Sequence, residues 1–158
     1  MIHFSLPQGH SSQLMPVLPL RVLLIDDSAF DRKWLCRLLN QTGFSIDIVE
    51  ADNLVAMKVA LDLPSFDIVF LDCHLPGSTL EEAVDRLPTG DCAKILITGH
   101  DAPCSLPSKG HTLLRKSAIS EEILTSYLLR HTMSVLVDSA CMENPISASV
   151  TSKLRIIH

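Results

Sequence analysis

Residues 68–77, IVFLDCHLPG, place four apolar residues directly before an acid, Asp72, and a Pro-Gly pair four residues after that acid. A short, continuously apolar run is typical of a strand buried on both faces of a sheet. Asp72 could simply cap this strand where a loop begins. Alternatively, the strand delivers the carboxylate to a functional site, and the distribution of polar residues elsewhere in the chain distinguishes the two.

Strand-like and helix-like patterns alternate on both sides of this stretch. Helical spacing fills the intervals, with Ser28, Asp52 and Ser120 as the expected N-caps of three helices. The first of these helices spaces Phe30 and Trp34 four residues apart on an expected core face. The expected strands are RVLLI (21–25), SIDIV (45–49), DIVFL (67–71), KILIT (94–98) and TLLR (112–115), and the expected helices are 28–40, 52–61, 78–87 and 120–132.

This alternation predicts an α/β fold, a three-layer sandwich around a five-stranded parallel sheet with the flavodoxin-like order 2-1-3-4-5. The segment 99–111 departs from the pattern, because Pro103, Pro107 and Gly110 oppose a long helix there. We therefore expect the helix between the fourth and fifth strands to be short or absent.

The 158 residues suit one domain with tails. Residues 1–19 mix Ser, Gln, Gly and Pro without periodicity and predict a flexible N-terminal arm. The domain is expected over residues 20–137. The polar, irregular residues 138–158 predict a flexible C-terminal tail.

Composition narrows the classes of function. Asp and Glu number 18 against 13 Lys and Arg, a net charge of −5, and no stretch is strongly basic, which disfavours nucleic acid as a partner. No run approaches the ~18 apolar residues of a membrane helix, and the N-terminus lacks the basic start of a signal peptide. Five scattered cysteines without a Cys-x-x-Cys pair favour reduced thiols. These features predict a cytoplasmic protein with no membrane partner.

Polar residues follow four of the expected strands: Asp26, Asp27, Asp72, Thr98 and Lys116. The carboxyl ends of parallel strands meet at one rim, so these side chains should converge. Three carboxylates at ~4 Å would repel by about 4 kcal/mol per pair at an effective dielectric of ~20. A hard divalent cation with oxygen ligands relieves this repulsion, and the small number of protein oxygens favours Mg²⁺ over Ca²⁺.

Such a site could transfer a phosphoryl group. With Mg²⁺ bound, one carboxylate can attack phosphorus, while the metal and Lys116 stabilise charge on the transferring oxygens. Thr98 could donate a hydrogen bond to a phosphoryl oxygen, and Gly99 leaves room beside it. Taken singly, each residue has an ordinary structural explanation; their joint placement at strand ends favours a site.

Four motifs, in this order, resemble the receiver domain of two-component response regulators: VLLIDDS, FDIVFLDCHLPG, KILITGH and LLRKSAISEEIL. The resemblance covers residues 20–135. It implies a signalling module rather than an enzyme, with only Mg²⁺-dependent self-phosphorylation and self-dephosphorylation. It further implies roles for the matching residues: Asp72 as phosphoacceptor and as a Mg²⁺ ligand, Asp27 as a direct Mg²⁺ ligand, Asp26 as a ligand mainly through water, the His74 carbonyl as a further ligand, and Thr98 and Lys116 as contacts of the phosphoryl group.

The chain departs from the usual receiver pattern at two positions of the lysine strand. Leu113 stands where an aromatic residue is usual, and Ser117 follows the lysine where proline is usual. The missing helical pattern at 99–111, after Thr98-Gly99-His100, is similar to a subset of receivers that carry Thr-Gly-Tyr and lack a regular fourth helix. That subset often works in phosphorelays or fused to sensor kinases.

Three functions remain open. The first is a single-domain response regulator that takes a phosphoryl group on Asp72 from a histidine kinase or a histidine phosphotransfer protein, and then signals through a partner or relays the group. The second is a receiver-like scaffold that binds a protein partner without phosphorylation. The third is a metal-dependent phosphohydrolase, disfavoured because His74 occupies the position of the second acid that such enzymes commonly need.

A transition-metal site is a separate possibility. His100, Cys104 and His111 lie in the segment 99–111, but their spacing matches no standard zinc pattern and favours ordinary loop residues.

Overall fold

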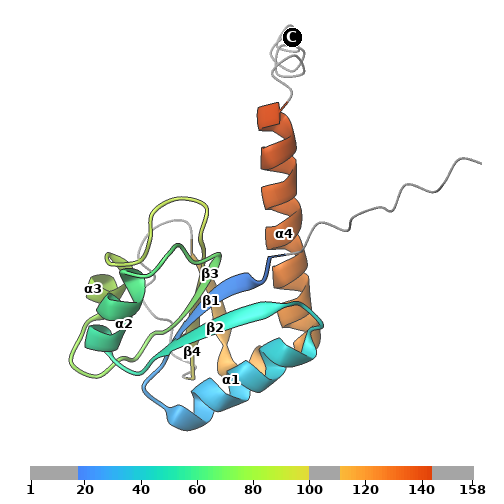
Figure 1. Cartoon of the computed structure of the whole chain (residues 1–158). Helices are drawn as coiled ribbons and strands as arrows, with labels where there is room; N and C mark the ends of the chain where they lie inside the picture. Colours follow the sequence, from blue (N-terminus) through green and yellow to red (C-terminus); the bar gives the residue numbers. More distant parts are fainter. Residues whose placement is uncertain (1–17, 100–110, 144–158) are drawn as a thin grey trace, which may run out of the picture.

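A computed structural model describes residues 18–99 and 111–143, with the side chains of 135–143 left out of the description. Its sheet has five parallel strands in the order β2-β1-β3-β4-β5, joined by crossover connections (Figure 1). The predicted fold class and strand order are confirmed. The strands are β1 (Leu20–Ile25), β2 (Ile46–Ala51), β3 (Ile68–Asp72), β4 (Ala93–Thr98) and β5 (Thr112–Arg115).

The central strands are apolar along their whole length because helices cover both faces of the sheet. All five residues of β3 are buried, and Val22–Ile25 of β1 are fully enclosed. The parallel register places Val22 beside Ile48 on one flank and Ile68 on the other, and Asp72 beside Ile97 of β4. Asp72 is therefore part of the hydrogen-bonded sheet as well as its end.

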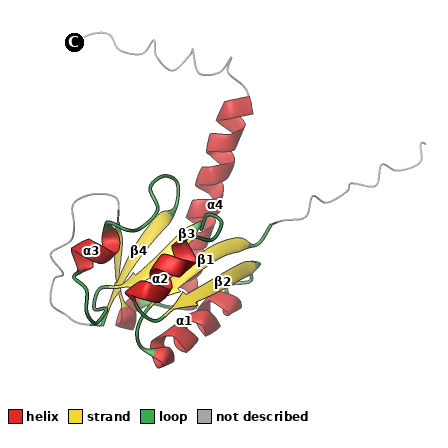
Figure 2. Cartoon of the chain, turned by 60° about the vertical axis from the view of Figure 1, so that its left-hand side comes forward, coloured by secondary structure: helices red, strands yellow, loops and turns green. Residues whose placement is uncertain are grey.

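Two layers of helices enclose the sheet (Figure 2). The helices are α1 (Ala29–Gln41), α2 (Leu54–Leu61), α3 (Leu80–Val84) and α4 (Glu121–Glu143), and a 3₁₀ turn, η1 (Lys116–Ala118), joins β5 to α4. Buried residues of α1 and α4 pack on one face of the sheet, and those of α2 and α3 pack on the other. The long helices therefore share one layer and the short helices share the other.

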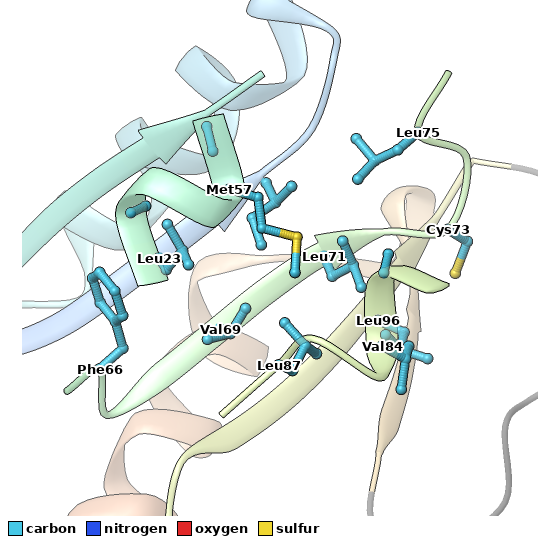
Figure 3. Close-up of a cluster of buried hydrophobic side chains, with 14 residues drawn as sticks. Leu23, Met57, Phe66, Val69, Leu71, Cys73, Leu75, Val84, Leu87 and Leu96 are labelled. Atoms are coloured by element: carbon cyan, nitrogen blue, oxygen red, sulfur yellow. The ribbon is translucent and has the colours of Figure 1, made fainter. Parts of the chain in front are cut away.

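Alternate residues of each strand supply the two cores. Leu23 and Val69 point to the α2 and α3 face, where Met57 reaches from α2 toward Leu71 (Figure 3). The neighbouring residues Val22 and Phe70 belong to the core under α1 and α4. This period of two explains why the strand sequences read as continuous apolar runs rather than as alternating patterns.

Two local predictions from the sequence were wrong. The second helix is capped by Asn53 rather than Asp52, because Asn53 Oδ1 accepts hydrogen bonds from the N–H groups of Val55 and Ala56 at 2.8 and 2.9 Å. Phe30 was expected on a core face of the first helix but is 79% exposed. Leu35 and Leu39 are the buried residues of α1, and Trp34 is half-buried beside them.

The expected N-caps Ser28 and Ser120 both accept hydrogen bonds from the first turns of their helices. The last helix, however, continues through residues 138–143, which the sequence assigned to a flexible tail. Its upper half projects past the edge of the sheet (Figure 1). The domain boundaries otherwise stay predictions, since residues 1–17 and 144–158 lie outside the described part of the chain.

The prediction of a short or absent helix between β4 and β5 falls on residues 100–110, which also lie outside the described residues. In the parts of the chain that are described, no helix is both long enough and apolar enough to cross a bilayer.

Candidate functional site

The polar residues predicted at the strand ends meet at one rim of the sheet. Asp26 and Asp27 follow β1, Asp72 ends β3, Thr98 ends β4, and Lys116 follows β5. Among the described side chains, the only buried polar or charged residues are Asp26 (2% exposed), Asp72 (6%) and Thr98 (2%). Buried polar groups are costly in a core, and here they occur only where the sequence predicted a site.

Three carboxylates form the centre of this site. Asp26, Asp27 and Asp72 each offer an oxygen, and these oxygens lie within 4.8 Å of one another. Asp27 is exposed, whereas the other two are buried, so the cluster opens to solvent on the Asp27 side. Oxygen ligands in this number and spacing suit a hard divalent cation such as Mg²⁺. The donor set therefore fits the metal that the sequence predicted.

Backbone groups fix two of these carboxylates. The Ser28 N–H donates to Asp26 Oδ1 at 2.8 Å, and the His74 N–H donates to Asp72 Oδ1 at 3.2 Å. The Cys73 N–H bonds to the carbonyl of Ile97 at 2.8 Å, which extends the β3–β4 pairing beyond the end of the strand. Asp72 consequently has little freedom to move away from the rim.

The turn after Asp72 explains the Pro-Gly pair. Gly77 has φ 76°, a left-handed conformation that side chains other than glycine rarely adopt. It directs the chain toward Thr79, whose hydroxyl accepts from the Glu82 N–H and caps α3. The chain thereby leaves the rim soon after His74, whose side chain is exposed.

Lys116 bridges the carboxylates from the opposite edge of the sheet. Its Nζ donates to Asp31 Oδ2 at 2.6 Å, to Asp26 Oδ2 at 2.8 Å and to Asp72 Oδ2 at 3.2 Å. An ammonium has three N–H donors, so each has a carboxylate partner. Its side chain is 18% exposed, which makes these ion pairs partly desolvated.

The electrostatics of the site shift two ionisation equilibria. Burial raises the pKa of Asp26, and the charge of Asp72 adds to this, against the lowering effect of hydrogen bonds from Lys116 and Ser28. Burial lowers the pKa of the Lys116 ammonium. The hydrogen bonds to Asp26 and Asp31, together with the charge of Asp72, outweigh that effect, so the pKa of Lys116 lies above its ordinary value.

Sequence reasoning missed two residues that support the site, Asp31 and Arg32 of α1. Asp31 makes the shortest contact with Lys116. Arg32 Nη1 donates to the backbone carbonyl of Asp26 at 2.7 Å, and its Nε pairs with Glu50 at 3.0 Å. Both residues lie in the first turns after Ser28, and a predicted helix start directly behind an acid pair was the signal that could have identified them.

Other predicted features fall outside the rim or outside the description. His100 and Cys104 are not among the described residues, so the transition-metal possibility stays untested. His111 is half-buried just before β5, and its Nδ1 has no hydrogen-bond partner among the described residues. Leu113, at the expected aromatic position, packs partly buried against the core under α2 and α3.

Comparison with solved structures identifies the architecture. The chain is similar to the crystal structure of a two component transcriptional regulator AraC from Clostridium phytofermentans, at 26% identity and a TM-score of 0.61, covering 77% of this chain and 98% of that one. It is also similar to a response regulator receiver domain (CheY-like) from Methylobacillus flagellatus, at 19% identity and a TM-score of 0.57, covering 72% and 99%. The chain has the receiver fold.

Curated proteins with similar sequences carry names from the same signalling class. A two-component response regulator of Arabidopsis thaliana is 25% identical over 77% of this chain and 67% of its own length. A hybrid signal transduction histidine kinase of Dictyostelium discoideum is 36% identical over 39% of this chain. The transcriptional regulatory protein LytR of Staphylococcus aureus is 34% identical over 52%.

The chain matches different shares of the length of these relatives. The chain spans 4% of the kinase and 34% of LytR, so it corresponds to one part of each. No family model matches the chain. The membership in a Thr-Gly-Tyr-like subset that the sequence suggested is not established by these similarities.

Proposed function

We propose that the chain is a phosphorylation-controlled signalling domain that accepts a phosphoryl group on Asp72, as the receiver domain of a response regulator does. The supporting observation is the buried Asp72 carboxylate, fixed at the end of β3 and within 3.2 Å of the Lys116 ammonium. Because Asp26 and Asp27 lie beside it, the site carries more negative charge than one ammonium neutralises. A divalent cation would neutralise this excess, together with the negative oxygens of an incoming phosphoryl group.

The donor in this proposal is a histidine kinase or a histidine phosphotransfer protein. An oxygen of Asp72 attacks phosphorus, the phosphorus–nitrogen bond of a phosphohistidine breaks, and the imidazole nitrogen takes a proton as it leaves. The product is an acyl phosphate on Asp72. The similar proteins include a hybrid histidine kinase and a response regulator, which supports a donor of this class.

Each residue of the rim has a proposed task. Mg²⁺, when bound, neutralises the carboxylates and the oxygens of the incoming phosphoryl group. Asp27 would hold the metal directly, Asp26 would hold it mainly through water, and the His74 carbonyl would supply a further oxygen. Thr98, buried at the end of β4, would donate to a phosphoryl oxygen, and Lys116 would exchange its contact with Asp72 for one with the phosphoryl group. The Asp72 carboxylate, which attacks phosphorus, would then no longer be bound to the Lys116 ammonium.

The test is intact mass after incubation with acetyl phosphate and Mg²⁺. We expect one added phosphoryl group on the parent protein and none on Asp72→Asn, which removes the attacking charge with little change of shape. Asp52→Asn serves as the control, because Asp52 is an exposed acid that follows β2 at the same rim. One phosphoryl group on Asp72→Asn would place the acceptor elsewhere.

A second candidate is a receiver-like scaffold that binds a protein partner without phosphorylation. Leu113 favours it, because this partly buried side chain has neither a ring nor a hydroxyl with which to report phosphorylation from β5. The same experiment separates the candidates. No labelling would favour the scaffold, stoichiometric labelling would favour the signalling domain, and many turnovers of acetyl phosphate per chain would indicate a phosphohydrolase.

The signalling partner follows from the same proposal. Output would pass through a downstream protein, or the phosphoryl group would be relayed to a second histidine-containing protein. Capture by the phosphorylated form of the chain but not by Asp72→Asn would identify either kind. The cytoplasmic location predicted from the sequence stays a prediction.

A further inference from the structure

Asp31 is the acid at the rim that has no assigned role, and it makes the closest contact with Lys116. Its Oδ2 lies 2.6 Å from Nζ, against 2.8 Å for Asp26 and 3.2 Å for Asp72. Its side chain is 28% exposed, so it lies nearer to solvent than the carboxylates of Asp26 and Asp72. The ammonium therefore has one partner at the edge of the site and two inside it.

The start of α1 leaves the Asp31 carboxylate available for this contact. A Glu or Gln three residues after a serine N-cap commonly reaches back to the backbone N–H of the cap, and Asp31 occupies that position. Here the Ser28 N–H is already bonded to Asp26 Oδ1 at 2.8 Å, while Ser28 Oγ accepts from the Asp31 N–H at 3.2 Å. The capping interaction is thus half-formed, and the Asp31 carboxylate turns to Lys116 instead.

Asp31 also differs from the other two partners of Lys116 in its relation to the metal site. Asp26 and Asp72 belong to the three carboxylates whose oxygens gather within 4.8 Å, and Asp31 does not. A divalent cation in that cluster would compete with the ammonium for Asp26 and Asp72. It would leave the contact with Asp31 intact.

We propose that Asp31 is a positioning residue that retains the Lys116 ammonium at the edge of the site while a divalent cation occupies Asp26, Asp27 and Asp72. This inference rests on the proposed function and extends it to how lysine and metal share one acidic cluster. Without Asp31, the ammonium has partners only among the metal's own ligands. Metal entry then has to leave a partly buried ammonium without a carboxylate partner, which is unfavourable.

The test is a double-mutant cycle on Mg²⁺ affinity, measured by calorimetry on the full chain without phosphodonor. We expect Asp31→Asn to weaken Mg²⁺ binding about tenfold, the equivalent of one charge-assisted hydrogen bond. In a Lys116→Met background there is no ammonium to retain. The same Asp31→Asn change should then weaken binding by about twofold or less, through lost charge alone.

Asp52→Asn is the matched control, since it removes one negative charge at the same rim without touching Lys116 in the structure. It should change Mg²⁺ affinity by about twofold or less. Circular dichroism and thermal unfolding of every variant verify that it is folded. If Lys116→Met does not fold, the comparison of Asp31→Asn with Asp52→Asn still tests the proposal. If Asp31 acted by its charge alone, the two variants would lose similar amounts of Mg²⁺ affinity.

Three outcomes would overturn the inference. Equal losses on Asp31→Asn in both backgrounds would mean that Asp31 acts by charge and not through Lys116. Tighter Mg²⁺ binding by Asp31→Asn would mean that the contact with Lys116 must break when the metal enters. Absence of Mg²⁺ binding by the parent would overturn the proposed function as well, which distinguishes that failure from the first two.

Discussion

Strand β1 carries a cluster of charges at each end, and the two clusters are built differently. At its start, the Arg21 guanidinium donates to the carbonyls of Pro64 and Ser65, pairs with Asp47 at 3.5 Å and stacks over the Phe66 ring at 4.9 Å. Most of its partners are neutral. At the other end of the strand, one ammonium lies among carboxylates only.

The two clusters differ in whether their charges are balanced by their own residues. The Arg21 cluster satisfies its cation with backbone oxygens, and the backbone N–H of Arg21 binds Asp67 at 2.7 Å, so this end of the sheet is stabilised by its own residues. The Lys116 cluster sets four aspartates against one ammonium, counting Asp26, Asp27, Asp31 and Asp72. A structural ion cluster is nearly neutral, whereas an excess of carboxylates, two of them buried, indicates a place for a cation from solution.

The largest difference between the two ends should appear in Mg²⁺ affinity. We expect Asp27→Ala, which removes the proposed direct ligand, to weaken binding by more than about a hundredfold. Asp26→Ala, which removes the carboxylate proposed to act through water, should weaken it by about tenfold. Calorimetric titration of each variant measures both. Equal losses from the two variants would contradict the assignment of Asp27 as the direct ligand.

The next largest difference between the two ends of β1 should appear in how stability depends on pH. Burial raises the pKa of Asp26 from its ordinary value of 3.8. Protonated Asp26 therefore stabilises the folded state. This contribution to the free energy of unfolding is present below pH 3.8 and is lost as the pH rises through the raised pKa. Asp26→Asn should remove this loss.

Urea denaturation of the parent and of Asp26→Asn between pH 4 and neutrality, without metal, measures the effect. The free energy of unfolding of the variant should gain on that of the parent as the pH rises. Curves that stay parallel over this range would contradict the raised pKa.

A substitution at the start of β1 should change stability and leave metal binding unchanged. Arg21→Met removes hydrogen bonds to exposed backbone carbonyls and should lower the free energy of unfolding by about 1–2 kcal/mol. Mg²⁺ affinity and labelling by acetyl phosphate should both stay within about twofold of the parent. A larger loss of metal affinity would show that the two ends of β1 are coupled, and the comparison would fail.

The smallest effect should come from Phe30, an aromatic residue at the functional end that contributes little to the core. Because this side chain is 79% exposed, Phe30→Ser should change the free energy of unfolding by less than about 0.5 kcal/mol. Labelling by acetyl phosphate should be unchanged. A thermal shift of more than a few degrees would mean that Phe30 is packed in solution.

The sequence predicted the fold and the rim because both depend on patterns that are local to each strand. Apolar runs and helix caps specify the order of elements, and parallel pairing then brings their ends together without any knowledge of contacts. Asp26, Asp27, Asp72, Thr98 and Lys116 were all found this way. Their chemical roles stay predictions.

The contacts that the sequence did not predict are those in which several residues could satisfy the same need. Asp52 and Asn53 are both good caps, and only the backbone geometry favours Asn53. Phe30 and Leu35 both fit an apolar stripe, but the helix passes over the sheet at Leu35 and not yet at Phe30. Lys116 and Asp31 are separated by 85 residues, and no local pattern tells which acids an ammonium will contact.

Helix α4 extends well beyond the part of it that packs in the core. Leu128 is its last buried residue among the described side chains, and the helix continues to Glu143. Fifteen further residues at about 1.5 Å each make an arm of about 22 Å. The arm is continuous with the segment that begins at Lys116, so a tilt of about 10° at its base would swing Glu143 through about 4 Å. Any tilt of α4 would therefore produce its largest displacement at the end of the helix that lies farthest from the segment beginning at Lys116.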